Sequence, residues 1–134
     1  MRALRNLLRV LFVLWAGSLW SLAAWVALTL FRMLPDRHVA GEIAARFFTI
    51  QTWLGIAVAA LALLLPGRGR LAKIYIAVAL LALNEWLLKR FMGLARAHGA
   101  AHGLSFAAWH GISAVLYVGA CLAVLASVWR DELR

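Results

Sequence analysis

Hydrophobic residues along this chain gather into four stretches that contain few charged residues. The stretches are residues 10–31, 47–66, 72–88 and 104–129. The hydrocarbon core of a bilayer is about 30 Å thick, and a helix that rises about 1.5 Å per residue needs about 20 apolar residues to cross it. Each stretch is therefore close to the length of one membrane crossing.

The same stretches predict helices rather than strands. Backbone amide groups within lipid need partners inside the protein, and an α-helix provides them within one segment. The alternating polarity of a transmembrane barrel strand is missing from residues 56–65 and 74–83. Because the connections between consecutive stretches are short, neighbouring helices should run antiparallel. The sequence therefore predicts an all-α fold, an integral membrane antiparallel four-helix bundle that forms a single domain over residues 1–134.

A proline and an acidic residue predict where the first two helices meet. Pro35 cannot continue a helical hydrogen-bond ladder, so the first helix should end near Leu34. Asp36 is placed favourably at the positive end of the next helix. We expect that helix to cover residues 36–46 at or beyond the membrane surface before it becomes the second span. Gly41 should let it approach a neighbour closely.

Glycines and a second proline predict the remaining turns. Pro66-Gly67 should end the second helix and begin a short basic turn at residues 68–70. The third helix should continue past the membrane through residues 87–97, before Gly99 marks a loop.

Small residues four positions apart predict close helix packing in three of the spans. The pairs are Gly17/Ser21, Gly55/Ala59 and Gly119/Ala123. In alanine-rich membrane helices such pairs also arise by chance.

Composition agrees with a membrane location. With 66% hydrophobic residues, the chain has too little polar surface to coat a soluble globule. The net charge is +9, and eight basic residues on the side of the termini face six on the opposite side. Because basic residues are retained in the cytoplasm, both termini are expected there. The expected partner is a bilayer with anionic headgroups, and no nucleic acid, since charges divided by a membrane form no continuous binding face.

Polar residues within the spans lie at a similar depth. Counted inward from the side that carries the 32–46 and 89–103 loops, Gln51, Asn84, Glu85 and His110 lie about 6–8 Å inside their spans. Thr29 of the first helix lies about 4–5 Å inside its span, so all four helices bring a polar group to a similar depth. Gln51, Asn84, Glu85 and His110 predict an intramembrane polar cluster. A carboxylate beside an imidazole could relay a proton or hold a metal.

A structural explanation of the same residues stays open. Glu85 and Lys89 stand four positions apart with the acid first, so Glu85 can pair with Lys89 near the headgroups. Gln51, Asn84 and His110 can then serve as hydrogen-bonding groups between helices.

Three further histidines are weak candidates for a metal site. His98 and His102 are four positions apart, and His38 belongs to the loop on the same side. Three imidazoles can hold zinc or copper. The glycines around His102 disfavour a helix, however, and no carboxylate or cysteine is fixed nearby, so we expect neither a metal nor another cofactor.

The sequence shows no motif that is typical of a catalytic site. The sequence contains no nucleophile elbow, phosphate loop, paired catalytic carboxylates or HExxH motif. We therefore expect a protein that is not an enzyme and acts as a membrane interaction module, through a membrane-protein partner or a homo-oligomer. The alternative is a metal- or proton-handling protein, or a transporter component, that uses the intramembrane polar cluster.

Residues 31–48 resemble the signature of the transmembrane protein 205-like family. The matching positions are Phe31, Leu34, Pro35, Ala40, Gly41 and Phe47. His110-Gly111 is similar to the start of the last span in that family, and Asn84 falls where its third span often carries a polar residue. The resemblance implies a small four-span membrane protein, located in the inner membrane for a bacterial member, and a domain whose biochemical activity is unknown. The chain departs from the pattern at residues 89–92, where a proline is expected.

Overall fold

Helices make up almost the whole described part of the chain. The structure, a computed structural model, describes residues 2–65 and 71–129. Its elements are α1 (Arg2–Ser21), η1 (Leu22–Val26), α2 (Ala27–Met33), α3 (Arg37–Ala62), α4 (Ala72–Leu83), η3 (Asn84–Leu88), α5 (Lys89–His98) and α6 (Phe106–Trp129). In this part of the chain α1, η1 and α2 follow one another without a break, as do α4, η3 and α5, so four long helices result. The all-α prediction is confirmed for these residues.

The turn at Pro35 forms as the sequence predicts. Leu34 leaves the helix with an extended backbone, and the Asp36 side chain accepts a hydrogen bond of 2.8 Å from the His38 backbone N–H. An aspartate oxygen at this position satisfies one of the N–H groups that a helix start leaves without a partner. The prediction of a helix over residues 36–46 is confirmed, because α3 begins at Arg37.

The end of α5 also agrees with the prediction. α5 ends at His98, and Gly99 follows with φ +82°, a left-handed conformation that glycine adopts at little cost. Ala101 and Leu104 then exchange backbone hydrogen bonds in the loop before α6. The predicted turn at residues 66–70 lies outside the described residues.

Among the described residues, three helices are long and apolar enough to cross a membrane. They are Arg2–Met33, Arg37–Ala62 and Phe106–Trp129. The helix formed by α4, η3 and α5 is also long, but it carries charges at both ends and in its middle, with Glu85 and Lys89 one turn apart. The predicted crossing at residues 72–88 therefore stays a prediction, whereas the other three helices indicate a membrane protein.

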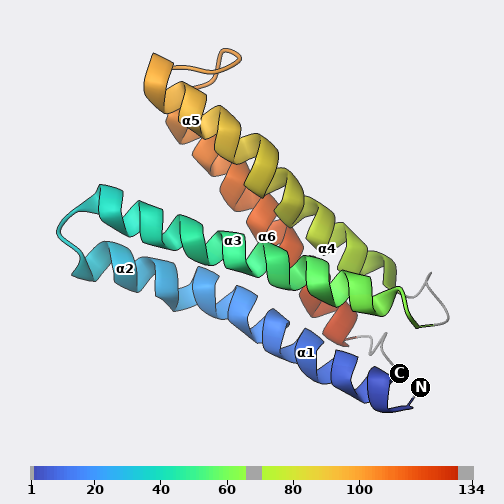
Figure 1. The fold of residues 1–134 in the computed structure, drawn as a ribbon. Helices are drawn as coiled ribbons and strands as arrows, with labels where there is room; N and C mark the ends of the chain where they lie inside the picture. Colours follow the sequence, from blue (N-terminus) through green and yellow to red (C-terminus); the bar gives the residue numbers. More distant parts are fainter. Residues whose placement is uncertain (1, 66–70, 130–134) are drawn as a thin grey trace.

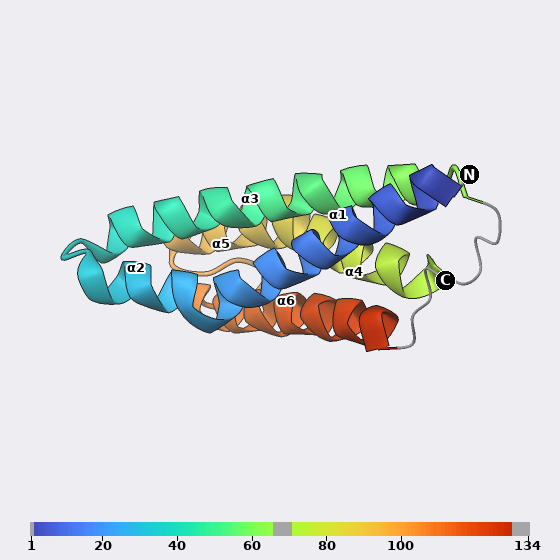
Figure 2. The same ribbon diagram turned by 90° about the horizontal axis from the view of Figure 1, so that it is seen from below.

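The helices pack as two hairpins that meet at one end and diverge at the other. The α1–α2 helix lies along α3, and the α4–α5 helix lies along α6 (Figure 1). Contacts of α3 with α4 and of α1 with α6 join the hairpins. The α2–α3 turn and the α5–α6 loop lie at the end opposite to the labelled termini (Figure 2). We call the end with α1, α4 and the last turns of α3 and α6 the closed half, and the other the open half.

Glycines distinguish the packed surfaces from the unpacked ones. A Cβ added at Gly55 would lie 2.6 Å from a ring carbon of Trp15, so Gly55 allows α3 to pack closely against α1, as the sequence predicts. At Gly119 the nearest atom would be a Leu80 methyl carbon at 3.5 Å. At Gly17 and Gly41 a Cβ would meet nothing within 4 Å. The predictions that these two glycines allow close packing are therefore wrong within this chain.

Candidate functional site: a polar belt between the helices

The first polar link joins α1 to α3. Ser18 Oγ donates a hydrogen bond of 2.9 Å to Gln51 Oε1, and the indole N–H of Trp15 donates one of 3.1 Å to the Gln51 backbone carbonyl. Trp15 and Gln51 are buried. Because a buried polar group without a partner costs free energy, these bonds favour one rotation of α1 against α3.

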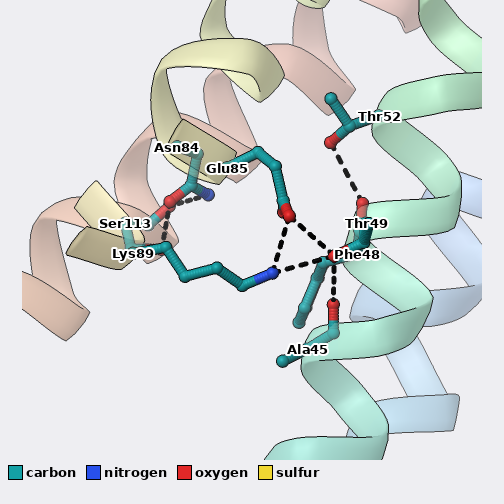
Figure 3. Close-up of polar contacts among 8 residues, drawn as sticks. All are labelled: Ala45, Phe48, Thr49, Thr52, Asn84, Glu85, Lys89 and Ser113. Carbon is teal, nitrogen blue, oxygen red and sulfur yellow. Dashed lines mark hydrogen bonds and ion pairs between the residues drawn. The ribbon is translucent and has the colours of Figure 1, made fainter. Parts of the chain in front are cut away.

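The second link joins α3 to the third helix and contains a charged pair. Lys89 Nζ lies 2.7 Å from Glu85 Oε1 and 2.8 Å from Thr49 Oγ1, which in turn lies 2.7 Å from the same carboxylate oxygen (Figure 3). The Glu85 side chain is only 13% exposed, against 38% for Lys89. The Thr49 hydroxyl also lies 3.0 Å from the Ala45 carbonyl, so its single proton has two possible acceptors.

The third link joins η3 to α6. Ser113 Oγ donates a hydrogen bond of 2.5 Å to Asn84 Oδ1, and Asn84 Nδ2 donates one of 3.3 Å to the Ser113 carbonyl. Adjacent residues of a helix point about 100° apart. Asn84 therefore bonds to α6, while Glu85 bonds to α3. Both side chains find a partner because their helix lies between these two neighbours.

The fourth link joins α6 back to α1. Tyr117 Oη donates a hydrogen bond of 2.6 Å to the Leu19 carbonyl, and the Tyr117 ring lies edge-on to Phe48 at 4.9 Å between ring centres. Each pair of neighbouring helices is thus joined by a polar contact. We call this set of side chains the polar belt. Its members are Ser18, Thr49, Gln51, Asn84, Glu85, Lys89, Ser113 and Tyr117.

Two π-helical turns lie close to the belt. In η1 the Ala27 N–H bonds to the Leu22 carbonyl, and in η3 the Lys89 N–H bonds to the Asn84 carbonyl, five residues earlier in each case. Such turns insert one residue into a helix and often occur at functional sites. Here η3 contains two of the belt residues, and η1 begins one turn after Ser18.

His110 does not belong to the belt. Its side chain is exposed, and its ring stacks on Phe106 at 6.0 Å between ring centres. The structure therefore does not bring His110 together with Gln51, Asn84 and Glu85 into the cluster that the sequence predicts. His110 lies seven residues before Tyr117 and so on nearly the same face of α6, but the hairpins have already diverged at its level.

Each of the three candidate metal-binding histidines has a different environment. His38 and Glu42 form an exposed pair at 3.4 Å, and His102 lies edge-on to Phe91 at 4.8 Å between ring centres. His98 is exposed at the end of α5. Within residues 2–65 and 71–129, no group of three or more His, Cys, Asp or Glu side chains is placed to hold a metal ion.

The residues that resemble a family signature surround the α2–α3 turn. Ala40 is fully buried, Leu34 is half-buried, and Phe31 and Phe47 are more than 40% exposed. Their placement sets the geometry of the turn and provides no reactive group.

Sequence reasoning missed half of the polar belt. Ser18, Thr49, Ser113 and Tyr117 are hydroxyl-bearing residues in apolar helices, and their only signal in the sequence is that polarity. It does not tell which of them meet, because their partners lie between 29 and 98 positions away.

Comparison with known families places the chain in one of them. Residues 10–129 match the family described as a domain of unknown function, DUF4149. The chain belongs to this family. The match covers all the belt residues and most of the described helices, and its description assigns no activity. No curated protein and no solved structure matches the chain.

Proposed function

We propose that this protein crosses a membrane four times and acts by contact with other membrane proteins or with copies of itself, without catalysis. The proposal includes a bacterial inner membrane, both termini in the cytoplasm, and kinship with the transmembrane protein 205-like group. The third helix is then a span in spite of its charges.

The observation that carries the proposal is the pairing within the polar belt. Gln51, Asn84 and Glu85 each bond to a side chain on a neighbouring helix. Polar side chains used in this way join helices in lipid, where no hydrophobic force brings helices together.

The charged pair supports a membrane location for the third helix. An isolated charge within a bilayer is expensive, and such residues face the protein interior and pair with one another. Glu85 and Lys89 do both, since Glu85 is 13% exposed and Lys89 also contacts Thr49.

The outer faces of the helices offer apolar surface for a partner. Leu14 is 64% exposed on α1 and Val115 is 70% exposed on α6. In a membrane these faces contact lipid or another protein.

Photo-crosslinking in intact membranes tests the proposal. A photoreactive amino acid is placed at one outward position in each of the four helices: Leu14, Ile50, Ile76 and Leu125. We expect a protein adduct of discrete mass at one or two of them, and its loss when the membranes are dissolved in detergent before irradiation. Absence of protein adducts at all four positions would contradict an interaction role.

Reporter fusions test the topology separately. A fusion after Arg134 and one within residues 99–105 should report opposite compartments, with the carboxy-terminal fusion in the cytoplasm. The same compartment for both fusions would contradict four crossings.

A second candidate function is proton handling by Glu85. It is favoured by the contact of one carboxylate oxygen with both Lys89 and Thr49 inside the helix bundle. Proton flux into vesicles that contain the purified protein, and its loss in Glu85→Gln, would support this function over an interaction role. Flux equal to that of protein-free vesicles would exclude it.

A further inference from the structure

We propose that water reaches the Glu85 carboxylate from one side of the membrane only, the side of the α2–α3 turn and the α5–α6 loop, and that Glu85 exchanges protons on that side alone. This inference rests on the four crossings proposed above and gives the proton-handling function of Glu85 a direction. It adds the route to the carboxylate, which follows one face of α3.

A polar face of α3 leads to Glu85 from the α2–α3 turn. Thr49 bonds to Glu85 and so marks the face of α3 that meets the third helix (Figure 3). Glu42 lies seven residues before Thr49 and His38 eleven residues before it, which places both within about 20° of that face. Their side chains are 63% and 62% exposed. Polar groups that water can reach therefore extend from the start of α3 toward Thr49.

In the other direction the same face of α3 is apolar. Ile56 and Ala60 lie seven and eleven residues after Thr49, at the mirror positions of Glu42 and His38. Their side chains offer water no hydrogen bond. The polar face of α3 therefore ends at Thr49.

The third helix shows the same asymmetry around Glu85. On one side, Lys89 is 38% exposed and lies 2.7 Å from the Glu85 carboxylate, which is itself 13% exposed. On the other side, Leu81 and Ile74 lie four and eleven residues before Glu85 and continue its face. Both are at most 3% exposed and belong to the core of the closed half. Because a close-packed apolar core excludes water, water reaches Glu85 from the side of Lys89.

Charged and titratable groups near Glu85 also lie on that side. Residues 50–62 of α3 and 111–129 of α6 contain no charged residue, and the next charge along the third helix toward the closed half is Lys73, about 18 Å from Glu85 by helix rise. The groups on the open side are Lys89 on the same helix, His38, Glu42 and Arg46 on α3, and His110 on α6.

The contacts of Glu85 leave a place for a proton. Lys89 and Thr49 both contact the same carboxylate oxygen, Oε1. A proton from hydronium can therefore bond to Oε2, which gives a neutral carboxyl group and a water molecule. Lys89 keeps the Thr49 hydroxyl as an acceptor at 2.8 Å, so its ammonium group does not lose every partner.

Cysteine labelling tests the route along α3. The variants are Glu42→Cys and Ala45→Cys on the polar side of Thr49, and Ile56→Cys and Ala60→Cys on the apolar side. A charged, membrane-impermeant thiol reagent is added to one side of sealed vesicles that contain the full-length protein. The wild-type rate is subtracted, since Cys121 is only 1% exposed. The reagent reacts with the thiolate, which forms in water, so the first two variants should react at least about tenfold faster, and only from the loop side.

Carbodiimide coupling tests access to Glu85 itself. A water-soluble carbodiimide activates a carboxyl group, and the Lys89 amine, 2.7 Å away, can then form an amide and release a urea. The product is lighter than the protein by one water molecule and is located by peptide mass. We expect it when the reagent is added on the loop side and not when it is added on the side of the termini. Glu85→Gln should abolish it, and Glu42→Gln should retain it.

Two outcomes would overturn the inference. Equal labelling rates in Ala45→Cys and Ile56→Cys would show that water is not confined to one side of Thr49. Coupling of Glu85 to Lys89 from the side of the termini, or from neither side, would contradict access from the loop side alone. Neither outcome bears on the four crossings, which the reporter fusions test, or on the interaction role, which the photo-crosslinks test.

Discussion

The closed and open halves of this protein both carry large apolar side chains, but they pack them differently. In the closed half, Phe12, Leu19, Ile74 and Val124 are at most 2% exposed and belong to one continuous core. In the open half, side chains of the same kind face outward, and Met33 is 76% exposed. The polar belt lies where one half changes into the other. Hydrophobicity alone therefore does not decide which part of a membrane helix is packed.

The α1–α2 helix shows the change within one element. Its inward side is buried at Phe12, Trp15, Leu19 and Leu22, and beyond η1 no residue of α2 is buried. The belt joins neighbouring helices at this level, so it closes the packed half. Matched substitutions, one in the packed region or the belt and one elsewhere, test this difference between the halves.

The largest effect is expected from removing a core ring. Phe12→Ala deletes a side chain that is 2% exposed and leaves a cavity, so the free energy of unfolding in mixed micelles should fall by about 2–4 kcal/mol. Phe31→Ala, at 44% exposure in the open half, should change it by less than about 1 kcal/mol. Equal losses would show that the open half is packed as tightly as the closed half.

The two glycines of α3 test the same difference by adding an atom. Gly55→Ala places a methyl group 2.6 Å from Trp15, and we expect a loss of about 1–3 kcal/mol from overpacking. Gly41→Ala meets open space and should stabilise α3 by about 0.5–1 kcal/mol through helix propensity. Detergent-induced unfolding measures both, and a loss in Gly41→Ala would place a neighbour against the open half.

The two acid–base pairs one turn apart test the belt. Glu85→Gln leaves Lys89 without its anion in a partly buried site, and should cost about 1–2 kcal/mol. Glu42→Gln breaks the exposed pair with His38 and should cost less than about 0.5 kcal/mol. A double-mutant cycle with Lys89→Met measures the coupling, and zero coupling would remove this pair from the belt.

The smallest effect is expected at His110. His110→Leu should change the free energy of unfolding by less than about 0.5 kcal/mol, because the exposed imidazole makes no belt contact. Asn84→Leu is the comparison, since it leaves the Ser113 hydroxyl without its acceptor and should cost about 1–2 kcal/mol. Equal losses of unfolding free energy in the two variants would show that His110 takes part in the belt contacts.

Local signals allowed the ends of the helices to be predicted. Pro35 and Asp36 act on the residues next to them, and Gly99 adopts the left-handed conformation that ends α5. Gln51, Asn84 and Glu85 were identified as interior polar residues because they interrupt apolar helices. Their partners could be predicted only in part. Lys89 follows Glu85 by one turn of the same helix, so this pair could be predicted, whereas Thr49 is 36 positions away from Glu85 and on another helix.

The sequence by itself determined an all-helical chain with apolar helices of membrane-spanning length and the positions of several of its turns. These properties depend on hydrophobicity and on steric rules within a few residues. Only the tertiary structure decided that Tyr117 meets the Leu19 carbonyl 98 positions away and that His110 lies beyond the belt. The physical reason is that helix rotation and hairpin divergence depend on the packing of all four helices together, with Trp15 filling the space beside Gly55 as one determining contact.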